Sequence, residues 1–203
     1  MFSLLHVFDL VGVFMCAMYG AYVGQKKGLD IFGILVCGAM TAVGGGTIRE
    51  ILLNHLPYYL FDYVSVLVIL LGVAASIFVY RWFEKIQFGM LIIDALGLTT
   101  FAYLGAASAA HAHLGLVGIV LFATISAVGG GIMRDVLVKE IPMIFYQDFY
   151  ATPAIILGFI FALTYPAVER PVVAYSLIVG IFCLRVLAIH FRISLWKRKN
   201  AEA

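Results

Sequence analysis

Long apolar segments, separated by short stretches that contain charged residues, glycine or proline, fill most of this sequence. Most of them hold the roughly 20 residues that an α-helix needs to cross a hydrocarbon core of about 30 Å. The alternation of apolar and polar positions that marks a membrane β-strand is absent from them. The pattern predicts seven membrane-spanning helices, at about residues 4–24, 30–53, 63–82, 89–110, 114–138, 149–167 and 171–191.

Composition supports lipid as the solvent of this chain. Of its 203 residues, 64% are hydrophobic and 12% are charged, whereas charged residues make up about a quarter of a typical water-soluble protein. Cys16, Cys37 and Cys183 lie inside apolar segments, without the spacing of a disulfide framework or a zinc site. We expect a membrane protein that is not an enzyme, that uses no cofactor and no nucleic acid, and that keeps its first helix.

Basic residues are distributed unevenly between the two ends of the predicted helices. Because the number of helices is odd, the two termini lie on opposite sides, and the side of the C-terminus holds most of the basic residues. The positive-inside rule therefore predicts a cytoplasmic C-terminus and an N-terminus outside the cell. The basic residues on the predicted cytoplasmic side are Lys26, Lys27, Arg81, Lys85, Arg134, Lys139, Arg192, Lys197, Arg198 and Lys199.

An internal repeat relates the two halves of the chain. The stretch GGGTIRE at 44–50 returns as GGGIMRD at 129–135, and the same offset of 85 residues aligns much of the flanking sequence without a gap. Between 9–63 and 94–148, 16 of 55 positions are identical, and they include an aspartate, an arginine and a proline. A register that keeps such residues over this length indicates a tandem repeat rather than shared membrane composition.

Each repeat contains three predicted helices, so the second copy enters the membrane from the opposite face. We expect an all-α membrane protein with a first repeat at 1–86, a second, inverted repeat at 87–170, and a seventh helix with a basic tail at 171–203. Inverted repeats place functional sites near the membrane midplane, at interrupted helices in matching positions of the two halves. The second and fifth helices, which carry the glycine triplets, fit that description.

The glycine triplets have two interpretations. Each glycine costs about 1 kcal/mol of helix propensity relative to alanine, which predicts helices broken at the triplets by a kink or by local unwinding. Carbonyls freed by a break could transiently coordinate Na⁺ or K⁺, and small residues could alternatively let two membrane helices approach closely. The glycines concerned are Gly44, Gly45, Gly46, Gly129, Gly130 and Gly131, with the cation contacts expected at Gly44, Gly45, Gly129 and Gly130.

Charged residues inside the predicted helices are the other candidates for an ion pathway. Asp9 and Arg49 share one leaflet, and Asp94 and Arg134 share the other, so we expect two ion pairs. All four could instead snorkel to the headgroups. Each arginine stands one helical turn beyond its triplet and suggests a gate or a lock, which the neighbouring Glu50 and Asp135 would partly neutralise. Arg185, deep in the seventh helix, is a further isolated charge, for which snorkelling toward the cytoplasm is the alternative interpretation.

Histidines and aromatic residues at the helix ends are weaker candidates. His111 and His113 stand two residues apart, which suits a metal only in an extended loop, so we expect an ordinary interfacial loop. The aromatic stretches PYYLFDY at 57–63 and FYQDFY at 145–150 follow the triplets in both halves. They are typical of an interfacial belt, with closure of a vestibule as the alternative.

These features together resemble a known family. Seven helices, two inverted three-helix repeats and the doubled Gly-Gly-Gly followed by Arg and an acid are similar to the prokaryotic members of the TRIC family, the trimeric intracellular cation channels. Related bacterial sequences are also catalogued as a glycine-transporter-like domain. The chain has MRDV at 133–136 where animal members carry a lysine-containing KEV motif.

The resemblance implies a homotrimer in a cell (inner) membrane, with one pore in each subunit that conducts potassium and also sodium. It implies that Arg49 and Arg134 line or restrict that pore. The alternative, from a different class of protein, is an alternating-access transporter of glycine or a similar small zwitterion, which the midplane breaks would hold by its carboxylate and amine.

Overall fold

The computed structural model describes residues 4–83, 87–146, 149–191 and 193. These residues form seven α-helices and three short 3-10 helices, and no strand occurs among them, which confirms the predicted fold class. The helices follow the predicted segments within a few residues, except for the sixth. They are α1 (Leu4–Lys26), α2 (Ile31–Leu52), η1 (Tyr58–Leu60), α3 (Tyr63–Phe83), α4 (Gln87–His111), α5 (Leu116–Leu137), η2 (Met143–Phe145), α6 (Thr152–Thr164), η3 (Ala167–Glu169) and α7 (Pro171–His190).

The sixth helix is shorter than the sequence suggests. It was predicted at 149–167, but α6 begins at Thr152 and ends at Thr164. Its 13 residues span only about 20 Å, less than the hydrocarbon core of about 30 Å. Pro166, which has no N–H to donate, separates α6 from η3. The apolar stretch therefore crosses the membrane only in part as an α-helix.

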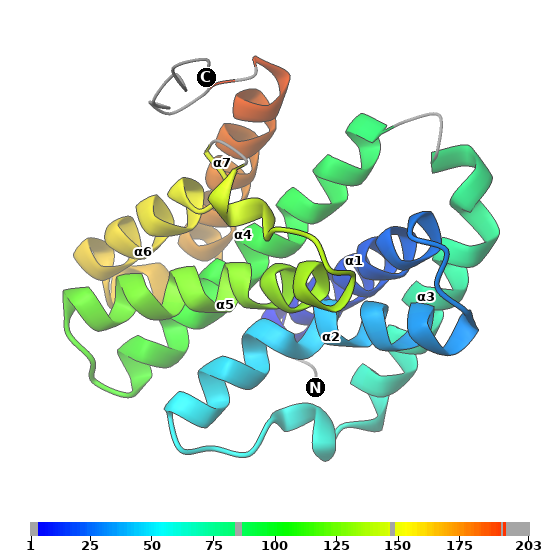
Figure 1. The fold of residues 1–203 in the computed structure, drawn as a ribbon. Helices are drawn as coiled ribbons and strands as arrows, with labels where there is room; N and C mark the ends of the chain where they lie inside the picture. The colour runs from blue at the N-terminus through cyan, green and yellow to red at the C-terminus, as the bar shows by residue number, and fades with distance from the viewer. Residues whose placement is uncertain (1–3, 84–86, 147–148, 192, 194–203) are drawn as a thin grey trace, which may run out of the picture.

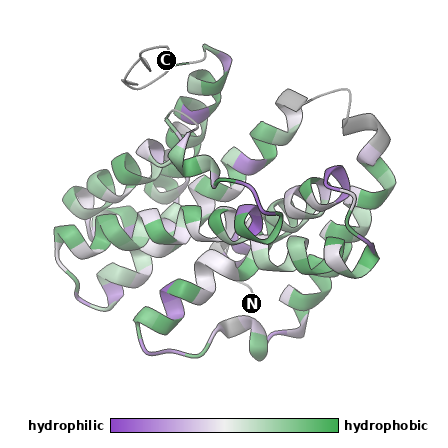
Figure 2. Ribbon diagram, in the orientation of Figure 1, coloured by the Kyte–Doolittle hydropathy of each residue, from purple (hydrophilic) through white to green (hydrophobic). Residues whose placement is uncertain are grey.

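Four helices form the centre of the molecule. In Figure 1, α1, α2, α4 and α5 lie together, α3 flanks them on one side, and α6 and α7 flank them on the other. The two repeats meet through matching elements, because α2 packs against α5 and α1 packs against α4. Hydrophobic residues cover most of each helix in Figure 2, and the hydrophilic residues concentrate at helix ends and connections. This arrangement suits a bundle surrounded by lipid.

The inverted repeat is kept in the backbone. The bounds of α2 and α5 differ by 85 residues at both ends, and so do those of η1 and η2. Asn54 and Lys139, which follow the two helices at this offset, both adopt a positive φ, 59° and 57°. In both places the N–H of the following residue donates a hydrogen bond to the backbone carbonyl of Glu50 or Asp135. This bond closes the helix in a Schellman motif.

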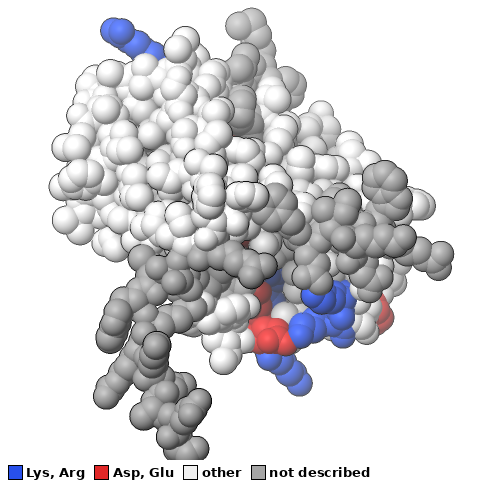
Figure 3. Space-filling view, turned by 90° about the horizontal axis from the view of Figure 1, so that it is seen from above, with Lys and Arg blue, Asp and Glu red and all other residues white. Residues whose placement is uncertain are grey.

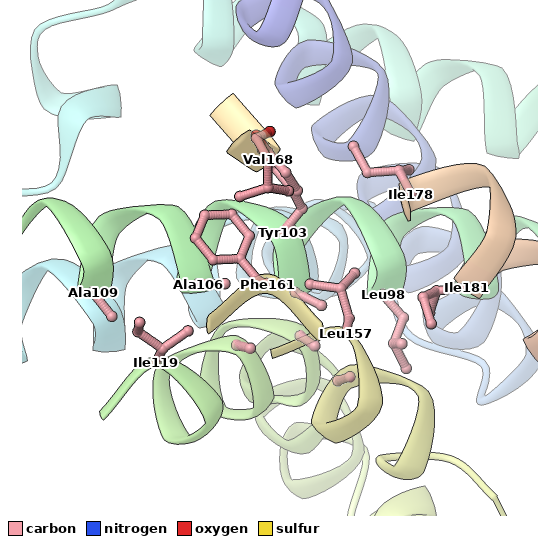
Figure 4. Close-up of a cluster of buried hydrophobic side chains, with 14 of the residues drawn as sticks. Leu98, Tyr103, Ala106, Ala109, Ile119, Leu157, Phe161, Val168, Ile178 and Ile181 are labelled. Carbon is pink, nitrogen blue, oxygen red and sulfur yellow. The ribbon is translucent and has the colours of Figure 1, made fainter. Parts of the chain in front are cut away.

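Two apolar cores stabilise the two halves of the bundle. The larger one joins α4, α5, α6 and α7 with η3, and Figure 4 shows Phe161 and Leu157 of α6 pointing toward α4 and α5 within it. The smaller one joins α1, α2, α3 and α4 through Val13, Ala42 and Val73. Figure 3 shows that most acidic and basic side chains gather at the lower edge of the displayed face, that a separate basic patch lies at the opposite edge, and that the described surface between them carries no charge. An uncharged outer surface is what lipid contact requires.

Candidate functional site

The glycine triplets lie where α2 crosses α5. Both helices remain α-helical through their triplets, so the predicted local unwinding does not occur, and Figure 1 shows α2 changing direction along its length, as a kinked helix does. A side chain at Gly45 would lie closer than 3.0 Å to the carbonyl oxygen of Ser126, and one at Gly130 would lie as close to that of Thr41. These four positions are related by the 85-residue offset. Close approach of two helices, rather than a break, therefore explains the glycines.

The continuous helices also change the predicted cation contacts. In lipid, a helix that opened its backbone would leave N–H and C=O groups without partners, at a cost of several kcal/mol each. The cost of glycine propensity, about 1 kcal/mol per residue, is smaller. Because α2 and α5 keep their α-helical pattern, the carbonyls of Gly44, Gly45, Gly129 and Gly130 are not freed by a break. The premise for cation binding at these carbonyls is thus removed.

Arg134 is the centre of a buried polar cluster next to the crossing. Its side chain is fully buried, and its Nε and Nη2 atoms lie 2.8 and 2.7 Å from Oδ1 of Asp135. Its Nη1 atom lies 3.6 Å from Oδ1 of Asp94, so the predicted pair between α4 and α5 is confirmed. Nη2 also lies 3.2 Å from the sulfur of Met143, and the guanidinium carbon lies 4.7 Å from the centre of the Tyr19 ring. Arg134 does not snorkel.

Asp135 is held from a second direction. Its Oδ2 atom accepts a hydrogen bond of 2.8 Å from the backbone N–H of Met143, the first residue of η2. This bond ties the end of α5 to the connection that follows it. The Asp135 carboxylate therefore holds both the Arg134 guanidinium and the start of η2. Hydrogen bonds to a charged group are stronger than those between neutral groups.

Tyr150 and Arg185 extend the cluster, and sequence reasoning assigned neither of them to it. Tyr150, expected in an interfacial belt, is buried, and its hydroxyl donates to Oδ1 of Asp94 over 3.4 Å. Arg185 is 1% exposed, so it does not snorkel. Its guanidinium lies 5.0 Å from the centre of the Tyr150 ring and donates a 2.7 Å hydrogen bond to the carbonyl of Phe149. The belt prediction was therefore wrong for Tyr150, and Arg185 is buried because α7 packs against α4 and α6 instead of standing in lipid.

The matching site in the first repeat is built differently. Nε and Nη2 of Arg49 lie 2.8 and 2.7 Å from Oε1 of Glu50, the same arrangement as in the second repeat. The ion pair that the structure gives for Arg49 is with Glu50, and the predicted pair with Asp9 stays a prediction. Asp9 itself is 8% exposed. His55 lies 3.6 Å from the other oxygen of Glu50 and is largely exposed. This end of the site therefore has an exposed side chain, His55, next to the buried Arg49.

Three cavities follow one another along α4. The first, of about 150 Å³, is lined by Met90 and Leu91 of α4 and by Tyr19, Tyr22 and Lys26 of α1. The second, which we call the central cavity, has about 10 Å³ and is lined by Asp94, Leu98 and Phe101 of α4, together with Cys16, Thr41, Gly45, Ser126, Ala127, Gly130, Gly131 and Tyr150. The third, of about 450 Å³, is lined by Ser108 and His111 near the C-terminal end of α4, by Ala112 directly after it, and by Glu50, Leu53 and His55.

Arg134 separates the first cavity from the central one. It contacts Tyr19, which lines the first, and Asp94, which lines the second. From Met90 to Ala112, an α-helix rises about 33 Å, close to the thickness of the hydrocarbon core. The cavities thus mark a line from one side of the bundle to the other, with its narrowest part at the crossing and a buried arginine beside it.

The histidines at the end of α4 do not form a metal site. His111 is the last residue of α4, and its Nε2 atom lies 2.6 Å from Oε1 of Glu169. His113 takes a positive φ of 56° in the turn that follows. Within the described ranges, no group of three or more potential ligands could hold a metal ion. The end of α4 is thus joined to η3 by a contact between the His111 ring and the Glu169 carboxylate.

The comparisons with known proteins match this geometry. A family model described as a glycine transporter matches the chain twice, at residues 6–81 and 91–166, which are themselves 85 residues apart. The UPF0126 inner membrane protein YadS of Escherichia coli is 36% identical over 196 residues, which cover 95% of both chains. A UPF0126 membrane protein of Deinococcus radiodurans is 40% identical over 153 residues, 74% of this chain and 71% of the relative.

Solved structures share the fold over nearly the whole chain. One, from work on conductance through TRIC cation channels, is 33% identical with a TM-score of 0.89 and covers 99% of this chain and 100% of that one. Another, a prokaryotic TRIC channel in 0.5 M KCl, is 37% identical with a TM-score of 0.83 and covers 96% and 100%. The TRIC orthologue of Rhodobacter sphaeroides is 29% identical with a TM-score of 0.84 and covers 93% and 98%.

Proposed function

We propose that the protein is a monovalent cation channel, and the premise is its family: the chain belongs to the glycine transporter family, whose model matches both of its halves. The similar solved structures are described as TRIC cation channels. On this proposal each subunit of a homotrimer in the cell membrane conducts potassium, and also sodium, through its own pathway. The trimer rests on the relative from Rhodobacter sphaeroides, which is described as trimeric.

The observation that carries the proposal is the line of cavities along α4. A conducting path needs a polar route through the bundle, and the intramembrane charges gather along this line instead of facing lipid. Asp94 and Glu50 supply carboxylates beside the central and the 450 Å³ cavities. Arg134, between two of the cavities, acts as the gate. Because a buried guanidinium repels cations, the structure corresponds to a closed path.

The proposed orientation places the C-terminus in the cytoplasm. Most basic residues lie on that side, as the positive-inside rule requires. The cavity lined by Tyr19 and Lys26 then faces the cytoplasm, and the cavity lined by Glu50 and His55 faces outward. A cysteine introduced at Phe191 should react with a membrane-impermeant thiol reagent only after the membrane is opened. Labelling of this cysteine in intact cells would show that the C-terminus lies outside and would contradict the proposed orientation.

A second candidate function is an alternating-access carrier of glycine. The family's description and the central position of the site favour it. The continuous helices disfavour it, because a carrier of this kind would bind the zwitterion at half-helix ends that α2 and α5 do not offer.

Recording from purified protein in planar bilayers separates the two functions. We expect unitary, ohmic currents in symmetric potassium chloride that reverse at the potassium equilibrium potential when potassium gluconate forms a gradient. Concentrative glycine uptake into proteoliposomes, without unitary currents, would contradict the channel and support the carrier.

A native thiol tests whether ions pass the crossing. Cys16 lines the central cavity, whereas Cys183 is exposed on the outside of α7. Silver ion is a monovalent cation that binds thiolates, so it should block currents irreversibly in the native protein. Cys16→Ala should remove the block, and Cys183→Ala should keep it. Equal block of both variants would place the path elsewhere.

A further inference from the structure

Two buried polar atoms at the crossing have no partner. Oδ2 of Asp94 and Oγ of Ser126 are buried and make no hydrogen bond to any described residue. Both residues line the central cavity, and the side chain of Asp94 is 8% exposed. A buried carboxylate oxygen and a buried hydroxyl without partners cost several kcal/mol together, which is rare in a native fold. Their position at one cavity indicates a ligand that satisfies both.

The size and chemistry of the cavity define that ligand. A volume of about 10 Å³ admits a single particle of about the size of a water molecule. The wall offers one carboxylate, the hydroxyls of Ser126, Thr41 and Tyr150, and no second carboxylate. Ca²⁺ requires six to eight oxygen ligands, usually with several carboxylates, and Mg²⁺ retains its waters. A monovalent cation without most of its hydration shell matches both the space and the single negative charge.

Arg134 is bound unequally to its two carboxylates. It lies 2.7 and 2.8 Å from Asp135, which the N–H of Met143 holds in place, but 3.6 Å from Asp94. Its Nη1 atom, the one nearest Asp94, makes no hydrogen bond to a described residue. The guanidinium can therefore leave Asp94 and keep its tighter partner. Asp94 is the carboxylate that can exchange its counter-ion.

The charge balance of the cluster determines how tightly a cation is held there. Arg134, Arg185, Asp94 and Asp135 carry two positive and two negative charges, so the cluster is neutral before an ion enters. Arg185 faces the cavity only through the ring of Tyr150, which lies between it and Asp94. An added monovalent cation is attracted by Asp94 and opposed by the two guanidinium groups. Such a site binds weakly, as conduction requires.

We propose that Asp94 and Ser126 form an internal binding site for one dehydrated monovalent cation, which takes the place of Arg134 at Asp94 while Arg134 stays on Asp135. The proposal rests on the cation-channel function and assigns its rate-determining ion site. No bond is made or broken covalently. The step exchanges one counter-ion of Asp94 for another, and it links entry of the ion to movement of the gate.

Unitary conductance as a function of potassium activity tests this site. In the native protein we expect conductance to saturate. Asp94→Asn keeps the shape and removes the charge, and we expect the half-saturating activity to rise roughly tenfold, equivalent to about 1.4 kcal/mol. Asp30→Asn, a matched change at the exposed N-cap of α2, should leave the curve unchanged, since asparagine caps helices as well as aspartate does. An unchanged curve in Asp94→Asn overturns the site.

A direct measurement of cation occupancy at Asp94 and Ser126 tests the binding site independently of the channel function. Crystals of the native protein grown in thallium(I), which substitutes for potassium, should show an anomalous peak between Asp94 and Ser126. Ser126→Ala removes one ligand without a change of charge and should weaken the peak, which covers the case that Asp94→Asn does not fold. Unitary currents without a peak would refute the site and leave the channel standing. A peak without currents would refute the channel.

Discussion

The crossing of α2 and α5 leads to a prediction about two neighbouring glycines. A methyl group at Gly45 would lie closer than 3.0 Å to the carbonyl oxygen of Ser126 and 3.0 Å from its carbonyl carbon, and both are backbone atoms of a packed helix. A methyl group at Gly46 would meet nothing nearer than Nη2 of Arg49, at 4.0 Å. Adjacent positions in one helix, with the same substitution, therefore differ only in what they touch.

The expected magnitudes follow from packing and propensity. Overpacking a tight core costs about 1–3 kcal/mol, and at Gly45 no flexible side chain can yield, so we expect the upper end. At 2–4 °C per kcal/mol for a chain of this size, a loss of about 3 kcal/mol lowers the Tm of Gly45→Ala by roughly 6–12 °C. Gly46→Ala removes a helix-weakening glycine and should change the free energy of unfolding by between zero and about +1 kcal/mol, so its Tm should stay the same or rise.

The assay is thermal unfolding of both variants in one detergent, followed by tryptophan fluorescence. Gly130→Ala, which faces the backbone of Thr41 in the same way, should repeat the loss seen at Gly45. If Gly45→Ala and Gly46→Ala melt together, the helices do not cross as closely as described. If Gly46→Ala alone is destabilised, a break in α2, and not close packing, explains the triplet.

Three further predictions concern the polar cluster and a helix end. Arg134→Gln should increase open probability in bilayer recordings, and Arg49→Gln should change it less, because Arg134 alone is sealed between two cavities; equal effects would contradict a single gate. Arg185→Met leaves the Phe149 carbonyl without its donor and should lower stability by about 1–3 kcal/mol, measured by the same melts. Lys139→Gly, at a φ of 57°, should raise stability by up to about 1 kcal/mol, and an unchanged Tm would argue against the left-handed helix end.

The repeat and its helices could be predicted from sequence because they depend on local properties. Apolar length sets each membrane helix, and an ungapped offset reveals a repeated backbone. The structure preserves that offset at the bounds of α2 and α5, at η1 and η2, and at the two left-handed helix ends. The pair of Asp94 with Arg134 was also predictable, since symmetry places both in one leaflet.

The errors have physical causes that sequence spacing does not contain. A glycine's propensity cost is visible in the chain, but the larger cost of unpaired backbone in lipid and the packing partner across the crossing are not. Arg185 and Tyr150 meet through α7, which lies outside both repeats, so the internal alignment gave no signal for them.

The seventh helix helps to make a symmetric backbone into an asymmetric pathway. At the offset of 85, Tyr19 corresponds to Leu104 and Tyr150 to Ser65, so the Arg49 end lacks the ring that lies against Arg134 and the hydroxyl that binds Asp94. Arg185 then fixes Tyr150 over Asp94 from a helix that the first repeat does not have. Two equivalent arginines flank the crossing, and both are buried. Among the described residues, Arg134 contacts two carboxylates and an aromatic ring, whereas the ion pair of Arg49 is with Glu50. A pathway with one sealed end and one open end needs a single movement to conduct, and the loosely held contact between Arg134 and Asp94 is where that movement costs least.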